Sequence, residues 1–215
     1  MDGLLLDTEK EWVKIERNFT KDHGIILSGE MQNATLGLRT IEVIKYWYNY
    51  KPWPNPDFHK TETEIEEYMR LYYIHSAPLM EGALEILNYF KQKKVRMALA
   101  SSSTMKLIDT FIKKYNLDGY FEVKHSAETE NFGKPHPGVY ITTAQMLGLH
   151  PSSCLAIEDS FNGVLAAKSA MMKAVAVPDN EHFNDPRFVI ADMKLKSLEE
   201  FGDKQFNELK IENGR

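Results

Sequence analysis

The chain opens with Met1-Asp2-Gly3-Leu4-Leu5-Leu6-Asp7-Thr8-Glu9, and this stretch decides how the rest is organised. Asp-Gly is a strong turn dipeptide, so the stretch is typical of a turn that follows the end of a strand. The apolar strand that would feed such a turn does not precede Asp2 in the sequence. The chemistry of the turn therefore has to be inferred from the rest of the chain.

The composition limits the class of protein. The 215 residues fit one large domain, or one domain with a smaller insert, and a hydrophobic content of 43% is enough for a core. The net charge of -5 favours neither nucleic acid nor an anionic membrane surface. Cys154 is the single cysteine, and no signal peptide or membrane-spanning run is visible. We expect a cytoplasmic monomer.

Two patterns of apolar residues divide the chain. Residues 9–77 show helical spacing only, whereas short apolar runs alternate with helices after Pro78. This alternation predicts an α/β fold with a doubly wound parallel sheet. A helical cap over 9–77 would then be inserted after the first strand of a core formed by 1–8 and 78–215. The expected helices are Glu9–His23, Thr40–Tyr50, Thr61–Ser76, Glu81–Gln92, Thr104–Tyr115, Pro137–Leu147, Asn162–Met172 and one from about Ser197; the expected strands are Val95–Ala100, Glu122–Lys124, Leu155–Ile157, Ala174–Val177 and Val189–Ala191.

Polar residues follow several of these strands, at the sheet edge where ligands bind in such folds. Ser101-Ser102-Ser103 follows Val95–Ala100. Hydroxyls and free N–H groups at a strand end can cradle a phosphate. The alternative is that a serine here only caps the next helix.

Charged residues follow the next two strands. Lys134 lies in Gly133-Lys134-Pro135-His136-Pro137, where it could neutralise an anion or be a solvated surface lysine. We expect His136 to be a loop residue rather than a catalyst. Glu158 and Asp159 follow a buried strand, where two carboxylates are costly unless they are compensated. A divalent cation would compensate both, whereas helix capping explains only one of them.

The order of these motifs resembles a known family. Asp-Gly-x-x-x-Asp-Thr-Glu, a serine after a strand, Lys-Pro-x-Pro and Glu-Asp-Ser-x-x-Gly follow one another as in the haloacid dehalogenase superfamily. The helical insert is similar to the C1 cap of its β-phosphoglucomutase-like branch. Within that branch, Thr35–Arg39, Pro52-Trp53 and Asn184–Val189 resemble the bacterial 2-deoxyglucose-6-phosphatase or hexitol phosphatase group.

The resemblance implies a Mg²⁺-dependent phosphatase that acts on a small phosphorylated sugar. Asp2 would be the general acid and base, and Ser101 and Lys134 would hold the phosphoryl group. Glu158, Asp159 and the main-chain carbonyl of Asp2 would bind Mg²⁺. Ser102 is a further candidate for substrate binding. Arg39 in the cap is either another substrate contact or a surface arginine.

The sequence departs from the family pattern in two places. The family's nucleophilic aspartate would stand two residues before Asp2, so we expect Met1 to be the residue between two motif aspartates, with the first strand upstream. Without that strand, its two neighbours would lose ladder partners. Trp12 stands where the mutase has a histidine, which favours a phosphatase. A phosphomutase and a catalytically dead phosphate-binding protein stay open as alternatives.

Overall fold

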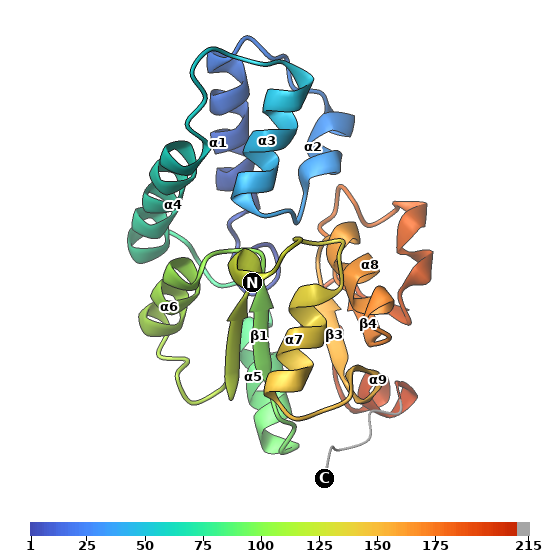
Figure 1. Cartoon of the computed structure of the whole chain (residues 1–215). Coiled ribbons are helices and arrows are strands. Elements are labelled where there is room, and N and C mark those ends of the chain that lie inside the picture. Colours follow the sequence, from blue (N-terminus) through green and yellow to red (C-terminus); the bar gives the residue numbers. More distant parts are fainter. Residues whose placement is uncertain (210–215) are drawn as a thin grey trace.

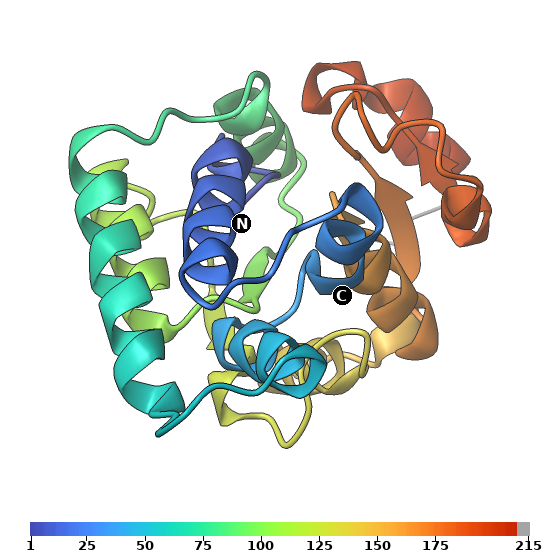
Figure 2. The ribbon, with the colours of Figure 1, turned by 90° about the horizontal axis from the view of Figure 1, so that it is seen from above.

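The computed structural model describes residues 1–209, in which a group of helices lies above a group of strands and helices (Figure 1). The upper group comes first in the sequence, as the predicted insert requires. Its bounds are α1 Glu9–Asp22, α2 Gly29–Thr35, α3 Thr40–Tyr50 and α4 Phe58–His75. Seen from above, α1 lies between α4 and α2 (Figure 2).

Helix α2 was not predicted, although its start carries a capping signal. The Ser28 hydroxyl accepts a hydrogen bond from the main-chain N–H of Met31 at 3.3 Å. Such a contact satisfies one of the free N–H groups at a helix start. The helix covers only seven residues, too few to show a clear apolar period.

The lower group is an α/β core, which confirms the predicted fold class. All strand pairs between its named strands are parallel, and helices separate successive strands along the chain. The strands are β1 Ala98–Ser101, β2 Val123–Ser126, β3 Leu155–Glu158, β4 Lys173–Ala176 and β5 Met193–Lys194; the helices are α5 Ala83–Gln92, α6 Met105–Lys114, α7 Gly138–Met146, α8 Phe161–Ser169 and α9 Asp203–Glu208.

The sheet consists of two separate parts. Strand β1 pairs with β2, and β3 pairs with β4, which pairs with β5. Within residues 1–209, no strand pairs with the other edge of β1 or of β3. Residues of β1 and of β3 line one cavity of about 220 Å³. Apolar side chains that include Leu5, Leu87 and Phe90 also line it. The two open edges therefore share a largely apolar space.

The strand predicted at Val189–Ala191 is wrong. Residues Pro186–Ile190 form a 3₁₀ helix, and the strand β5 follows it. Asp185 caps this helix by accepting a hydrogen bond from the Arg187 N–H at 2.9 Å. Proline at the first helical position also favours a helix start, because its fixed φ suits the helix and no N–H is lost there.

Helix α4 links the upper group to the core. Its residues Met69 and Tyr73 are fully buried and belong to the main hydrophobic cluster, together with Leu6 and Phe111. The Lys114 ammonium of α6 donates to the carbonyls of Tyr73 and of Ala77, the latter at 2.8 Å. The domain division at residue 77 therefore stays a prediction. No helix within residues 1–209 is long and apolar enough to cross a membrane.

Candidate active site

The opening turn is fixed against the core by main-chain contacts. The Gly3 N–H donates to the Leu6 carbonyl at 2.9 Å, and Leu6 bridges to Leu79. Gly3 has a φ of +68°, and a Cβ atom there would lie 2.2 Å from Oδ2 of Asp159. Glycine is therefore required here. The first motif thus lies directly beside the last one.

The Asp2 carboxylate is held by three hydroxyl groups. Its Oδ1 accepts from Thr8 Oγ1 at 2.8 Å and from the Tyr73 hydroxyl, and its Oδ2 accepts from Ser103 Oγ at 2.7 Å. The three donors come from the segment before α1, from α4 and from the loop after β1. Burial raises the pKa of Tyr73 well above its ordinary value, and the adjacent Asp2 carboxylate adds to this rise, so Tyr73 stays a donor. The orientation of Asp2 therefore depends on both groups of elements.

The three serines at the end of β1 make contacts with different parts of the protein. Ser101 is buried, and its Oγ accepts from the Ser103 N–H at 3.1 Å. Ser102 Oγ donates to the carbonyl of Gly37 at 2.8 Å, so it contacts the loop between α2 and α3. The predicted capping role falls to none of them, because Thr104 precedes α6 without a side-chain cap.

Lys134 is not a solvated surface lysine. Its side chain and that of Glu158 are each only 6% exposed, and the ammonium donates to Oε1 of Glu158. The Tyr140 hydroxyl of α7 donates to the same oxygen. Burial alone would raise the pKa of Glu158, but the adjacent Lys134 ammonium lowers it below its ordinary value. The pair therefore keeps both charges in a place sheltered from water.

Asp159 provides the test of whether a cation fits. Burial and the neighbouring Glu158 carboxylate raise the pKa of Asp159 to about 7. Within residues 1–209, no side-chain hydrogen bond compensates this carboxylate. The Lys134 ammonium and the N-terminal ammonium oppose this rise only in part. A hard divalent cation with oxygen ligands would compensate the remaining cost, so Asp159 fits Mg²⁺. Glu158 fits less directly, because its Oε1 already binds Lys134 and Tyr140.

A second group of possible metal ligands was not predicted. Carboxylate and imidazole atoms of Glu9, Asp179 and His182 lie within 4.8 Å of one another. Burial and the nearby Asp179 carboxylate raise the pKa of Glu9 to about 8. The His182 ring contacts Asp179 at 2.8 Å and Asn33 of α2 at 2.6 Å. No sequence motif indicates this group, because its members come from two distant segments of the chain.

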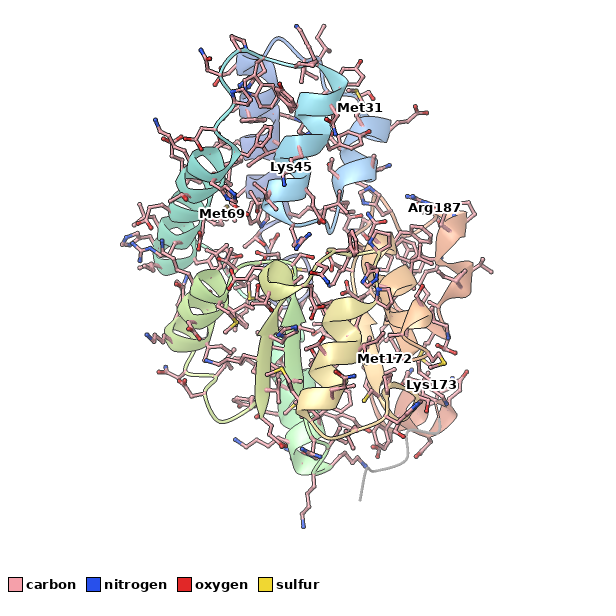
Figure 3. All side chains as sticks on the ribbon, viewed as in Figure 1. Met31, Lys45, Met69, Met172, Lys173 and Arg187 are labelled. Carbon is pink, nitrogen blue, oxygen red and sulfur yellow. The ribbon has the colours of Figure 1, made fainter. Side chains whose placement is uncertain are left out.

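The loop that joins α2 to α3 rests on the core. The Leu36 carbonyl accepts from Asn162 Nδ2 at 2.9 Å, and a Cβ atom on Gly37 would lie 2.4 Å from Ser160 Oγ. Arg39 donates through Nη1 to the carbonyls of Ala127 at 3.1 Å and Glu130 at 2.9 Å. Figure 3 shows side chains filling the space between the upper helices and the core.

Pairwise contacts thus bring several of the predicted site residues to the carboxyl ends of β1 and β3. Asp2 reaches the serine loop through Ser103, the opening turn lies against Asp159, and Lys134 pairs with Glu158. Sequence reasoning missed the residues that hold these groups. Thr8 and Ser103 belong to quoted motifs, but no contact with Asp2 was assigned to them. Tyr73 and Tyr140 lie within predicted helices, where the sequence indicates no role beyond packing.

Comparisons with known proteins identify the class. The haloacid dehalogenase-like hydrolase family matches residues 1–177, so the chain belongs to this family. It is 36% identical over 201 residues to hexitol phosphatase B of Escherichia coli, covering 93% of this chain and 90% of that protein. A phosphorylated carbohydrates phosphatase of Thermotoga maritima is 24% identical over 185 residues, covering 81% of each chain.

Solved structures agree with the fold. A β-phosphoglucomutase from Clostridium difficile superposes with a TM-score of 0.81 at 20% identity, covering 96% of this chain and 92% of that one. The predicted family and the predicted class of phosphoric monoester hydrolase are confirmed. Haloacid dehalogenase-like hydrolases generally use Mg²⁺.

Proposed function

We propose that this protein hydrolyses small sugar phosphates, such as a hexose, deoxyhexose or hexitol 6-phosphate, through an aspartyl-phosphate. The observation that carries the proposal is the buried Lys134–Glu158 pair at the strand ends, beside Asp159. A sheltered ammonium suits the negative charge of a transferring phosphoryl group. The named activities of hexitol phosphatase B and of the phosphorylated carbohydrates phosphatase support the substrate class.

Each residue has a stated role in this proposal. Lys134 and Ser101 hold the phosphoryl group. The nucleophile that the family resemblance implies is an aspartate two residues before Asp2, a position outside the 215 residues. Asp2 protonates the leaving sugar oxygen and later takes a proton from the attacking water. Substrate contacts from Ser102 and Arg39 stay predictions, because both side chains also bind main-chain carbonyls.

Asp159, Glu158 and the main-chain carbonyl of Asp2 would hold Mg²⁺. The bound ion supplies positive charge to the phosphoryl oxygens. The raised pKa of Asp159 supports this assignment, because a nearby cation would favour the ionised carboxylate. We further propose that the protein works as a cytoplasmic monomer and binds neither nucleic acid nor membrane, in line with its net charge of -5.

The test is phosphate release from 2-deoxyglucose 6-phosphate and from a hexitol 6-phosphate, with Mg²⁺ and with EDTA. Three chains are compared: the 215-residue chain, the same chain extended by an apolar strand that ends in Asp directly before Met1, and that extension with Asn in place of Asp. We expect Mg²⁺-dependent release only from the Asp extension. Release from the unextended chain would overturn the assigned nucleophile.

Two other functions give different results in the same assay. A phosphomutase would yield an isomerised sugar phosphate instead of free phosphate. A phosphate-binding protein without turnover would bind inorganic phosphate and release none from any of the three chains. The place of Trp12, where the mutase has a histidine, favours the phosphatase over the mutase.

A further inference from the structure

The upper helices contact the segment that leads into Lys134 through one ion pair. Arg39 Nη2 donates to Glu42 Oε1 at 2.6 Å, across the first turn of α3. The side chains are only 14% and 27% exposed. Arg39 Nε is buried, and no partner for it lies within residues 1–209. The pair is therefore enclosed at the contact between the two groups of elements.

Both members of the pair bind main-chain groups of residues 127–133. Arg39 donates to the carbonyls of Ala127 and Glu130, and Glu42 Oε1 accepts from the Gly133 N–H at 3.0 Å. Three main-chain groups in this short segment thus depend on two side chains of the upper group. Residues far apart in the sequence meet here, so the contact forms only when the upper helices rest on the core.

The main chain at Gly133 lies very close to the ion pair. A Cβ atom on Gly133 would lie 2.1 Å from Glu42 Oε2 and 2.8 Å from Arg39 Nε. A side chain at this position would displace the ion pair, so main chain and ion pair approach each other directly. The next residue is Lys134, whose ammonium is buried against Glu158.

We infer that Arg39 and Glu42 are positioning residues, which fix residues 127–133 and thereby the Lys134 ammonium while the upper helices rest on the core. The ion pair binds the residue directly before Lys134, because the Gly133 N–H donates to Glu42. Movement of the upper helices away from the core would release this segment and loosen Lys134. The inference rests on the proposed function in one respect, the role of Lys134 in phosphate binding.

The experiment measures hydrogen exchange in peptides that cover residues 127–136, and the affinity for inorganic phosphate in the presence of Mg²⁺. The variants are Glu42→Ala and Arg39→Lys. A lysine keeps the charge but lacks the second nitrogen by which Arg39 binds Glu42 and the two carbonyls at once. Glu42→Gln keeps an acceptor for Gly133 and should recover part of the effect. Glu64→Ala is the matched control, since Glu64 pairs with Lys60 on an exposed face of α4 at 3.9 Å.

We expect exchange in residues 127–136 to rise about tenfold and phosphate affinity to fall about tenfold in Glu42→Ala and Arg39→Lys, because charge-assisted hydrogen bonds are lost. Inorganic phosphate has no sugar, so a sugar-binding role of Arg39 alone would leave its affinity unchanged. Unchanged exchange in both variants, or an equal rise in Glu64→Ala, would overturn the inference. If the parent protein binds no phosphate, the proposed function fails, while the exchange data still test the positioning role.

Discussion

Glu158 in the core and Glu16 in the upper group are both withdrawn from water, yet their pKa values move in opposite directions. Glu158 contacts the Lys134 ammonium, which lowers its pKa although burial opposes this. Glu16 Oε1 accepts from Thr35 Oγ1 at 2.7 Å and Trp47 Nε1 at 2.9 Å, and burial raises its pKa.

The charge of the partner makes the difference. Two neutral donors bind Oε1 of Glu16, but they do not offset the loss of hydration of its charge. For Glu158, the positive charge of the Lys134 ammonium offsets this loss of hydration. The upper group therefore uses its buried carboxylate to join α1 to α2 and α3, whereas the core keeps two opposite charges at the strand ends, where the proposed chemistry needs them.

Among the variants that test this comparison, we expect Lys134→Met to have the largest effect on stability. It leaves the Glu158 carboxylate, in a residue only 5% exposed, without its counter-charge. We expect the free energy of unfolding to fall by about 3–5 kcal/mol, measured by urea denaturation at pH 7 in EDTA. The matched control is Lys60→Met, whose side chain is 70% exposed, and it should change stability by less than about 0.5 kcal/mol.

The double variant Lys134→Met/Glu158→Gln separates a lost attraction from an unpaired charge. If the unpaired carboxylate causes the instability, the double variant should be more stable than Lys134→Met alone by at least about 1 kcal/mol. Purely additive losses would contradict the view that the two charges compensate each other.

Tyr73→Phe should have a smaller effect. It removes the hydroxyl by which α4 contacts Asp2, but Thr8 and Ser103 still donate to that carboxylate. We expect a loss of about 1 kcal/mol in unfolding free energy, measured by urea denaturation. Tyr72→Phe is the control, because no hydrogen bond of the Tyr72 hydroxyl is found within residues 1–209. Equal losses in the two variants would argue against a specific Tyr73–Asp2 contact.

The smallest effect concerns the pH dependence that Glu16 introduces. Because its pKa is raised in the folded protein, the folded state binds more protons than the unfolded state above about pH 4.5, the ordinary value. Its contribution to stability is therefore fully present at lower pH and is lost as pH rises through the raised pKa. Glu16→Gln should gain stability relative to the parent over this range, by urea midpoints between pH 4 and 8. A difference that does not change with pH would exclude this role.

Much of the fold followed from apolar spacing and strand-end motifs. Helix α3 has the predicted bounds, because Thr40–Tyr50 carries a clear helical period. The two-part sheet agrees with the family resemblance, which implies that the first strand lies between two neighbours in the sheet. The strand at 189–191 failed because a local cap at Asp185 and the following proline outweigh a short apolar run.

The candidate site was predictable only in part. Motif order singled out Asp2, Lys134 and the acidic pair as candidates, and the acidic pair stands at the end of β3. The hydroxyl donors Tyr73 and Tyr140 lie in helices, where a tyrosine at an apolar position predicts burial and nothing more. Their partners are 71 and 18 residues away in the sequence, so no local pattern indicates them.

The sequence by itself determined the family, the order of helices and strands, and the residue types at the strand ends. Local spacing and motif order carry that information along the chain. Only the tertiary structure decided that Lys134 is buried against Glu158, that Tyr73 of the upper group contacts Asp2, and that the Arg39–Glu42 pair binds the segment before Lys134. The burial of a charged side chain, and the charge of the group beside it, depend on which distant segments come into contact. These two properties decide whether the side chain is a solvated surface group or part of a site.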